Sequence, residues 1–408
     1  MEHLTRAHLT PFHGVIQNRS FRLLWTSGII MHISEWVQTI TLGWLALTLT
    51  NSSAFVGQVN FMGGLPVLLL TLPAGALLDR IDRRRALIAA QLLGMLVALT
   101  VALFISSNVI VPWHLLVAAV LNGSLLAVSV PAGQALVADV VARDDLTSAL
   151  GLNAAGMSAT RILGPSIGGV LIGVVGVVWS FVFQAAGLFL AGVCTFFMRG
   201  NERRERQKQG AERRTGRSVL AALRNDPVLI GLLAQAMAPG LLAYPVVALL
   251  PVLARDRLAL GAGGLGVLMA ASGIGAVVGS LIVAMLGSYH HKGRLLMVIG
   301  VTYGFVMTAF AQSPWVAVSC VVFACSSCLG VLHNALTTAL LQARAPEALR
   351  GQLTGALMVS FGLTPIGALG LGALAERIGV ANAISCGALA SSLCIALTML
   401  VYRNLRRL

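Results

Sequence analysis

Long apolar segments alternate with short polar ones along almost the whole chain of 408 residues. Most of the apolar segments are about 20 residues long, the length that an α-helix needs to cross a bilayer. Cuts at charge clusters, Gly, Pro and Asn-Ser turns predict twelve membrane-spanning helices, at residues 22–49, 54–78, 86–106, 113–134, 150–176, 178–198, 227–253, 262–287, 294–312, 314–341, 352–375 and 379–402. Polar residues and glycines interrupt these segments, as in helix bundles that enclose a wet cavity.

The overall composition supports a membrane protein and argues against an enzyme. The chain is 57% hydrophobic and 10% charged, with a mean hydropathy of +0.87, which is outside the range of soluble globular domains. It contains no nucleophile motif, no cluster of metal ligands and no glycine-rich phosphate loop after a strand. We therefore expect an all-α membrane protein that is not an enzyme and holds no metal or cofactor.

The net charge of +14 could suggest a nucleic-acid partner, but its distribution follows the membrane. If the N-terminus is cytoplasmic, 24 of the 28 Lys and Arg residues fall on the cytoplasmic side of the predicted spans. This is the positive-inside bias of membrane proteins. It predicts two cytoplasmic termini and the lipid bilayer, rather than nucleic acid, as the surrounding partner.

The longest polar stretch, Arg199 to Arg217, separates six predicted spans from six. A solvated tether is the favoured reading of this basic stretch, with a lipid or nucleic-acid patch as the alternative. The predicted organisation is an N-terminal arm (1–21), a six-helix bundle (22–198), a cytoplasmic linker with a short amphipathic helix (199–226), a second six-helix bundle (227–402) and a tail (403–408).

Several features recur about 200 positions later in the second half. Asn18 and Asn225 open corresponding spans, and Pro165 and Pro365 interrupt corresponding spans. Parallel six-helix repeats imply two pseudo-symmetric bundles around a central cavity, with alternating access by rocking of one bundle against the other.

Two charges lie deep within apolar segments, Glu35 in the first span and Arg161 in the fifth. A carboxylate at that depth costs about 2.5–3.5 kcal/mol on insertion scales. Both helices run in the same direction and place the charges at similar depth. The pair is either a structural ion pair that locks two helices or a proton or substrate site in a transporter.

The cysteines are less informative. Cys325 and Cys328 form a C-x-x-C pair on a membrane-embedded helix, where a packing role is favoured over a zinc or redox site.

The loop after the second span reads Gly75-Ala-Leu-Leu-Asp79-Arg80-Ile-Asp82-Arg83-Arg84. Gly75 allows close helix approach, and the arginines are within reach of Asp139 at the end of the fourth span. Such a cluster can form when an inner gate closes and break when it opens. The alternative is plain positive-inside charge.

This loop resembles the signature that the major facilitator superfamily carries between its second and third helices. Asp82 stands where the broad family has Gly, and this variant resembles the branch that exports drugs and siderophores. The resemblance implies that a cluster of Gly75, Asp79, Arg80, Arg83, Arg84 and Asp139 holds the outward-open state.

A second motif, Arg161-Ile-Leu-Gly164-Pro165-Ser-Ile-Gly168-Gly169, resembles the Gly-Pro-x-x-Gly-Gly element of the antiporter subfamilies. The match is partial, because Thr160 stands where a glycine is usual. A structural kink at Pro165 is the alternative reading, and the glycines allow close packing between the halves. The segments 18–25, 65–66 and 345–351 also resemble macrolide-efflux and enterobactin-export proteins.

In the resembling fold the first and fifth helices are neighbours, which makes a Glu35–Arg161 pair plausible and suggests that Glu35 carries the coupled proton. Polar residues on cavity-type helices are candidate substrate contacts or, as the alternative, interhelical hydrogen bonds: Trp36, Gln38, Asn122, Gln235, Tyr244, His333 and Asn334.

The sequence therefore predicts a monomeric, multi-pass transporter of the bacterial inner membrane. It is expected to export an amphipathic small molecule, such as a drug or secondary metabolite, by proton antiport. The alternatives are a siderophore exporter or lipid-like transporter of the same fold, and a transporter-like sensor without flux.

Overall fold

The computed structural model describes residues 13–142, 145–198, 224, 226–286, 291–346 and 362–402, together with 349, 353, 356, 357, 360, 404 and 405. Most of the predicted linker and its amphipathic helix (218–226) lie outside the described residues. The first half contains α1 (His13–Gln17), α2 (Arg19–Thr50), α3 (Ser53–Leu78), α4 (Arg83–Ser106), α5 (Pro112–Val140) and α6 (Leu146–Phe196). The second half contains α8 (Pro227–Leu242), α9 (Val246–Asp256), α10 (Ala262–Met285), α11 (Lys292–Gln312), α12 (Val316–Arg344), α14 (Thr364–Ile378) and α15 (Val380–Val401).

Two glycines with positive φ separate consecutive passes at equivalent places in the halves. Gly176, at φ 85°, divides α6 into two passes, and Gly379, at φ 84°, separates α14 from α15. A left-handed backbone favours glycine, because a Cβ atom would be strained there. With α6 counted twice and α8 and α9 as one interrupted pass, the described helices make the twelve passes that the sequence predicts. The all-α membrane fold is confirmed.

The seventh pass departs from the predicted uninterrupted helix. It breaks at Ala243–Pro245 between α8 and α9, where the backbone N–H of Tyr244 bonds to the carbonyl of Pro239. Proline at 245 removes a helical donor at the break. Tyr244 therefore lies between two helices rather than within one.

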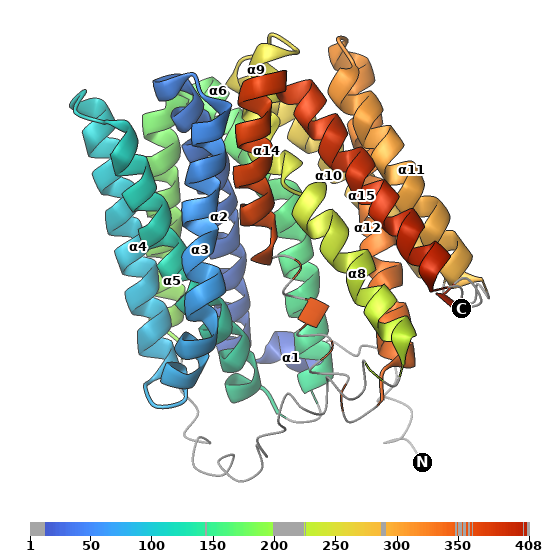
Figure 1. Cartoon of the computed structure of the whole chain (residues 1–408). Coiled ribbons are helices and arrows are strands. Elements are labelled where there is room, and N and C mark those ends of the chain that lie inside the picture. Colours follow the sequence, from blue (N-terminus) through green and yellow to red (C-terminus); the bar gives the residue numbers. More distant parts are fainter. Residues whose placement is uncertain are drawn as a thin grey trace, which may run out of the picture.

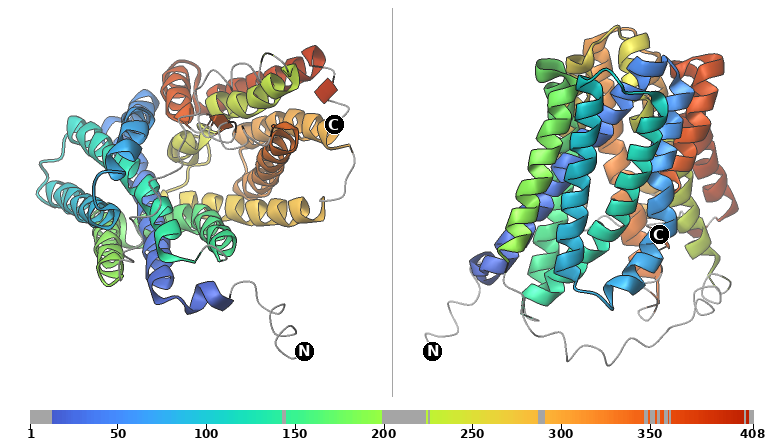
Figure 2. Two further views of the ribbon diagram at one scale, coloured as in Figure 1. Left: turned by 90° about the horizontal axis from the view of Figure 1, so that it is seen from below. Right: turned by 90° about the vertical axis from the view of Figure 1, so that its left-hand side faces the viewer.

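The helices form two groups, α1–α6 and α8–α15, as seen along the bundle in Figure 2. Figure 1 shows the two ends of the molecule. We call the end with the α3–α4 turn and Arg83 the arginine end, and the end with the α2–α3 turn the Asn51 end. The α1 helix lies at the arginine end, and α9 lies at the Asn51 end.

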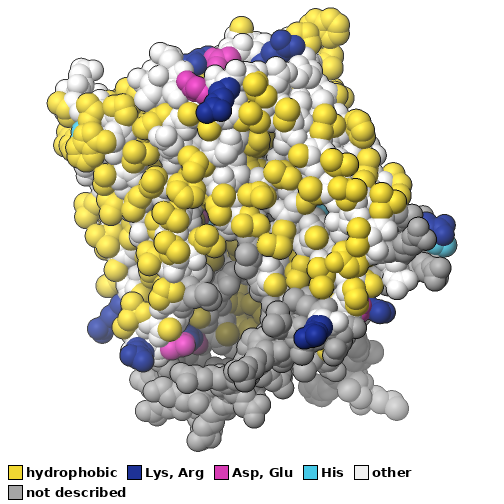
Figure 3. Space-filling view, viewed as in Figure 1, with side chains coloured by type: hydrophobic (Ala, Val, Ile, Leu, Met, Phe, Trp, Pro, Cys, Tyr) yellow, Lys and Arg dark blue, Asp and Glu magenta, His cyan; other side chains and the backbone are white. Residues whose placement is uncertain are grey.

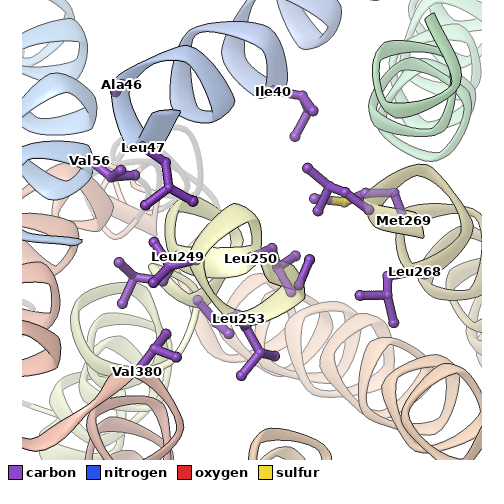
Figure 4. Close-up of a cluster of buried hydrophobic side chains, with 14 of the residues drawn as sticks. Ile40, Ala46, Leu47, Val56, Leu249, Leu250, Leu253, Leu268, Met269 and Val380 are labelled. Carbon is purple, nitrogen blue, oxygen red and sulfur yellow. The ribbon is translucent and has the colours of Figure 1, made fainter. Parts of the chain in front are cut away.

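The halves share a hydrophobic core only toward the Asn51 end. There, Leu249, Leu250 and Leu253 of α9 pack among Ile40 and Leu47 of α2 and further side chains of both halves (Figure 4). Toward the arginine end the core is split into two clusters. One is drawn from residues 15–198 and the other from residues 228–405.

The helix pairs that join the halves agree with this division: α2 and α3 pack on α9, α3 packs on α14, and α6 packs on α10. The surface is hollowed between the halves toward the arginine end (Figure 3). In the described part of the chain, the two bundles therefore meet at the Asn51 end and diverge toward the arginine end.

Candidate functional site

Glu35 lies midway along α2 and pairs with His32 of the same helix. The His32 Nδ1 atom is 2.9 Å from Glu35 Oε2, and both side chains are half-buried. The spacing of three residues brings the two side chains to one face of the helix. His32 is a functional candidate that the sequence analysis missed, although its position three residues before Glu35 could have indicated that the two side chains lie on one face of the helix.

Arg161 is not the ionic partner of Glu35 in this conformation. Among the ion pairs of the described residues, Glu35 pairs with His32 alone. Arg161 is exposed on α6, within electrostatic range of His32 and of Tyr244 from the other half. The predicted contact between Glu35 and Arg161 is not among the ion pairs of the described residues, and His32 interacts with both groups.

Tyr244 and Asn334 bring the second half to these polar groups. Tyr244, at the break between α8 and α9, lies beside the Asn334 side chain of α12, and its ring lies edge-on to Tyr303 at 6.4 Å. Of the predicted cavity residues, these two are placed together and lie near Arg161. The site therefore draws on both bundles, as a transport site between halves requires.

The other predicted cavity residues serve packing in this conformation. Gln38 accepts a hydrogen bond from Gln184 Nε2 at 3.1 Å, and Asn122 donates to the Ala118 carbonyl of its own helix. Trp36 packs on the backbone of α6 at Gly164. These contacts favour structural roles over ligand contact for the three residues: an interhelical hydrogen bond for Gln38, a bond within its own helix for Asn122 and helix packing for Trp36.

Gln235 and His333 are buried inside the second bundle and do not line the space between the halves. Gln235 Nε2 donates to the Ile395 carbonyl at 3.1 Å, and its Oε1 lies 3.4 Å from His333 Nε2. Both side chains are almost fully inaccessible. Their assignment as cavity residues is corrected here: they tie α8 to α12 and α15.

A small pocket of about 30 Å³ adjoins His32 within the first half, lined in part by Ser27, Gln91, Gln134 and Asn153. That volume holds about one water molecule. The Oε1 atom of Gln91 is buried without a hydrogen-bond partner among the described residues, and Gln91 Nε2 donates to Ser27 Oγ. A water there would have a polar partner beside His32.

The arginine-end motif forms a cluster, but with fewer members than predicted. Arg83 bonds to Asp139 at 3.1 Å and to Asp79 at 3.1 Å, all within the first half. Arg80 is exposed at the same turn. In this conformation the halves meet at the Asn51 end and diverge at the arginine end, yet Arg83 keeps both ion pairs. The expectation that the cluster breaks when the arginine end opens therefore does not hold for Arg83.

Arg84 and Asp82 have separate structural tasks. Arg84 donates to the carbonyls of Thr195 and Phe196 at the C-terminus of α6, where a cation is favoured. Asp82, the departure from the family's glycine, caps α4 by accepting from the backbone of Arg84 and Arg85. Nothing lies within 4 Å of the place that a Cβ atom on Gly75 would take, so no close approach uses Gly75 here.

The glycines of the second motif pack α6 on two different neighbours. Gly164, before Pro165, and Gly168 face α2 in the first half. Gly169 faces the second half, where a Cβ atom added to it would come within 2.3 Å of Gly266 Cα on α10. The predicted packing between halves is therefore carried by Gly169.

The chain belongs to the major facilitator superfamily. The family MFS_3, described as transmembrane secretion effector, matches residues 8–407. The resemblance inferred from the motifs is confirmed, and the chain is a multi-pass membrane transporter of this superfamily.

Individual relatives carry siderophore names. The chain is 24% identical over 396 residues to the staphyloferrin A transporter of Staphylococcus aureus (strain NCTC 8325 / PS 47), covering 95% of this chain and 96% of that protein. It is 28% identical over 377 residues to the enterobactin exporter EntS of Citrobacter koseri (strain ATCC BAA-895 / CDC 4225-83 / SGSC4696), covering 89% and 84%.

Solved structures share the fold. A bacterial homolog of the human lysosomal transporter Spinster, inward-facing and unoccupied, aligns with a TM-score of 0.74 at 13% identity, covering 95% of this chain and 96% of that one. The nucleoside transporter NupG aligns with a TM-score of 0.72 at 13% identity, covering 95% and 98%. At these identities the likeness concerns the fold alone.

Proposed function

We propose that this protein exports a siderophore-type small molecule across the bacterial inner membrane in exchange for protons. The single observation that carries the coupling is the His32–Glu35 pair at the middle of α2. An ionisable pair at this depth is costly, and such residues in membrane-spanning helices mark substrate or proton pathways. The names of the relatives favour a siderophore as cargo over a drug, and the two can be separated by experiment.

The arrangement supports a simple cycle. When the Asn51 end is open to the outside, a proton enters and binds the His32–Glu35 pair, which weakens the ion pair. When the arginine end is open to the cytoplasm, the proton leaves and the cargo binds. Arg161 and Tyr244 come from opposite halves and lie within electrostatic range of each other, and Arg161 is exposed, so Arg161 supplies positive charge for an anionic, oxygen-rich cargo.

The orientation in this cycle follows from charge. The basic residues concentrate at the arginine end and in the linker, so the positive-inside rule places that end and both termini in the cytoplasm. We infer that the protein works as a monomer, because the two bundles of one chain together enclose the space that transport requires.

The test is proton-driven export by purified protein in vesicles, with a proton-sensitive dye inside and a siderophore as cargo. Glu35→Gln mimics the protonated acid and should retain cargo binding while proton-coupled flux falls by about 10²-fold or more, as loss of an essential proton-transfer group does. His32→Gln should reduce coupled flux in the same direction. His114→Gln is the matched control, because His114 lies at the start of α5, where it accepts a hydrogen bond from the Val111 backbone N–H and contacts the Phe104 and Trp113 rings.

A double variant separates transport from a merely structural pair. If His32→Gln combined with Glu35→Gln recovers proton-driven export, the pair only locks the helix and Glu35 is not the carrier. If the wild-type protein moves a drug panel but no siderophore, the cargo class is wrong while the coupling stands.

A further inference from the structure

The turn between α2 and α3 is held by two charged residues from the other half of the molecule. Asn51 ends α2 in a left-handed conformation, and Ser52 caps the start of α3. Arg255 of α9 and Glu376 of α14 reach this turn from the second half. Neither residue belongs to the motifs or to the proton site described above.

Glu376 completes the N-terminus of α3. Its Oε2 atom accepts from the backbone N–H of Ala54 at 3.1 Å and from the hydroxyls of Ser53 and Ser52 at 3.0 and 3.1 Å. The first N–H groups of a helix have no partner within the helix, and the positive end of the helix dipole favours a carboxylate there. Glu376 lies in the last turn of its own helix, where a negative charge is disfavoured. The contact across the halves therefore offsets an unfavourable position within α14.

Arg255 completes the C-terminus of α2. Its Nη1 atom donates to Asn51 Oδ1 at 2.8 Å and lies 3.4 Å from the Leu47 carbonyl, while its Nε atom is held by Asp256 at 2.6 Å. A cation at the carbonyl end of a helix is favoured by the helix dipole. Each charge thus meets the helix end of opposite sign on either side of a single turn.

The neighbouring Arg257 does not make a contact of the kind that Arg255 makes with the other half. Arg257 follows Arg255 by two positions, yet it donates to the Gln312 carbonyl at 2.7 Å and remains within the second half. Arg255 crosses to the first half and Arg257 does not. The two arginines provide a matched pair of the same residue type at the same end of the molecule.

Glu376 borders an open pocket of about 430 Å³ between the halves, which Asn51, Ser53, Asp256 and Arg257 also line. The Arg255 side chain beside it is 30% exposed. Acidic and basic side chains gather at this end of the surface in Figure 3. Because water can solvate the carboxylate and the guanidinium when they separate, the contacts can break without leaving a buried charge unpaired. An ordinary surface ion pair contributes little to stability. These two charges differ from such a pair because they lie over the hydrophobic core that the halves share.

We propose that Arg255 and Glu376 form a clasp that keeps the Asn51 end closed by gripping the two helix ends of the α2–α3 turn, and that each transport cycle releases it. The clasp rests on the alternating access of the proposed function, but it does not depend on which group carries the proton. Its residues act by positioning the halves and do not contact cargo.

The test measures distance between the halves at the Asn51 end. Spin labels are placed at Ser107→Cys and Pro314→Cys, exposed positions of the two halves, in full-length protein whose native cysteines are replaced. In lipid nanodiscs, Glu376→Gln and Arg255→Gln should each raise the ratio of the separated to the closed distance by about tenfold, the effect of one charge-assisted hydrogen bond. Arg257→Gln should leave the wild-type ratio unchanged.

Two results overturn the clasp: unchanged distances in both Glu376→Gln and Arg255→Gln, or an equal change in Arg257→Gln. Each single variant serves as a check on the other if one fails to fold. The outcome is independent of the coupling proposal, because distances that shift as expected while proton-driven flux is absent would overturn only the proposed function.

Discussion

The two ends of the interface between the halves are built differently. At the Asn51 end the bundles share one hydrophobic core, and polar contacts from Arg255 and Glu376 cross from one half to the other. At the arginine end each bundle has its own core. The ion pairs there, Arg83 with Asp139 and Arg344 with Asp226, remain within a single half.

The comparison shows which contacts hold a bundle together and which hold the two bundles to each other. Pairs within a half can persist through the transport cycle, so they define rigid bodies. Pairs across the halves have to break when that end opens. In this conformation the described residues supply such polar pairs at the Asn51 end, which is consistent with an opening toward the arginine end.

Two acids make the contrast sharper. Asp79 and Glu376 lie at the C-terminal ends of α3 and α14, which pack against each other across the halves. Glu376 meets the N-terminus of the neighbouring helix α3, whereas Asp79 is largely exposed and bonds to Arg83 of its own half. Asp79 therefore stabilises its own half, whereas Glu376 stabilises the contact between the halves.

The largest effect is expected where the halves touch backbone to backbone. In Gly169→Ala the added Cβ would lie 2.3 Å from Gly266 Cα, so the Asn51 end cannot close as it does here. Overpacking of this kind costs about 1–3 kcal/mol, and we expect export to fall by about tenfold or more. Export from cells and the spin-label distances measure it.

Gly151→Ala on the same helix is the control, because nothing lies within 4 Å of its Cβ position. Export at the wild-type rate in Gly169→Ala, with the closed distance retained, would contradict the role of the glycine contact.

A second prediction concerns the two acids. Glu376→Gln removes a contact that joins the halves at the closed Asn51 end, whereas Asp79→Ala removes a partner of Arg83 within one half. If each contact contributes about 1 kcal/mol, Glu376→Gln should shift the distance between the halves and lower export several-fold, while Asp79→Ala should leave the distance unchanged. Spin-label distances and initial export rates, normalised to membrane expression, decide this. A distance shift in Asp79→Ala as large as that in Glu376→Gln would contradict the comparison.

The smallest effect is expected within the bundles, where the two halves resemble each other. Ser27→Ala removes the hydroxyl that bonds to Gln91 and to the Ala191 carbonyl, and Gln235→Ala removes the partner of His333. Buried polar contacts in membrane bundles contribute about 0.6 kcal/mol on average. Thermal unfolding in detergent should show a small, similar destabilisation of both variants without a shift in the distance between halves. Ser280→Ala, an exposed position, is the control; a distance shift in either buried variant would contradict rigid halves.

Much of the fold could be predicted from the sequence for a plain physical reason. A membrane-spanning helix must satisfy its backbone groups internally over a fixed thickness, so length and hydropathy reveal the spans. The break predicted at residues 176–178 coincides with Gly176, and its counterpart Gly379 lies about 200 positions later, in step with the other repeats. The break of the seventh pass was missed, because an apolar segment that contains prolines does not specify whether its helix bends or is interrupted.

The site was predictable only in part. Burial cost alone singled out Glu35 and Arg161, since charges are rare at that depth. The partner of Glu35 depended on the direction of its side chain, and in the structure that partner is His32 of the same helix. Gln235 and His333 could not be assigned by composition, because hydropathy does not distinguish the face of a helix that lines a cavity from the face packed inside a bundle.

The sequence by itself determined the class of protein, the twelve passes, the two repeated halves and the motifs of the superfamily, because all of these follow from local composition and spacing. Only the tertiary structure decided which end of the interface is closed, that Gly169 rather than Gly75 provides close approach, and that Arg255 and Glu376 reach across the halves. These outcomes depend on contacts between residues roughly 100 to more than 300 positions apart, and such contacts are set by how the two bundles dock against each other.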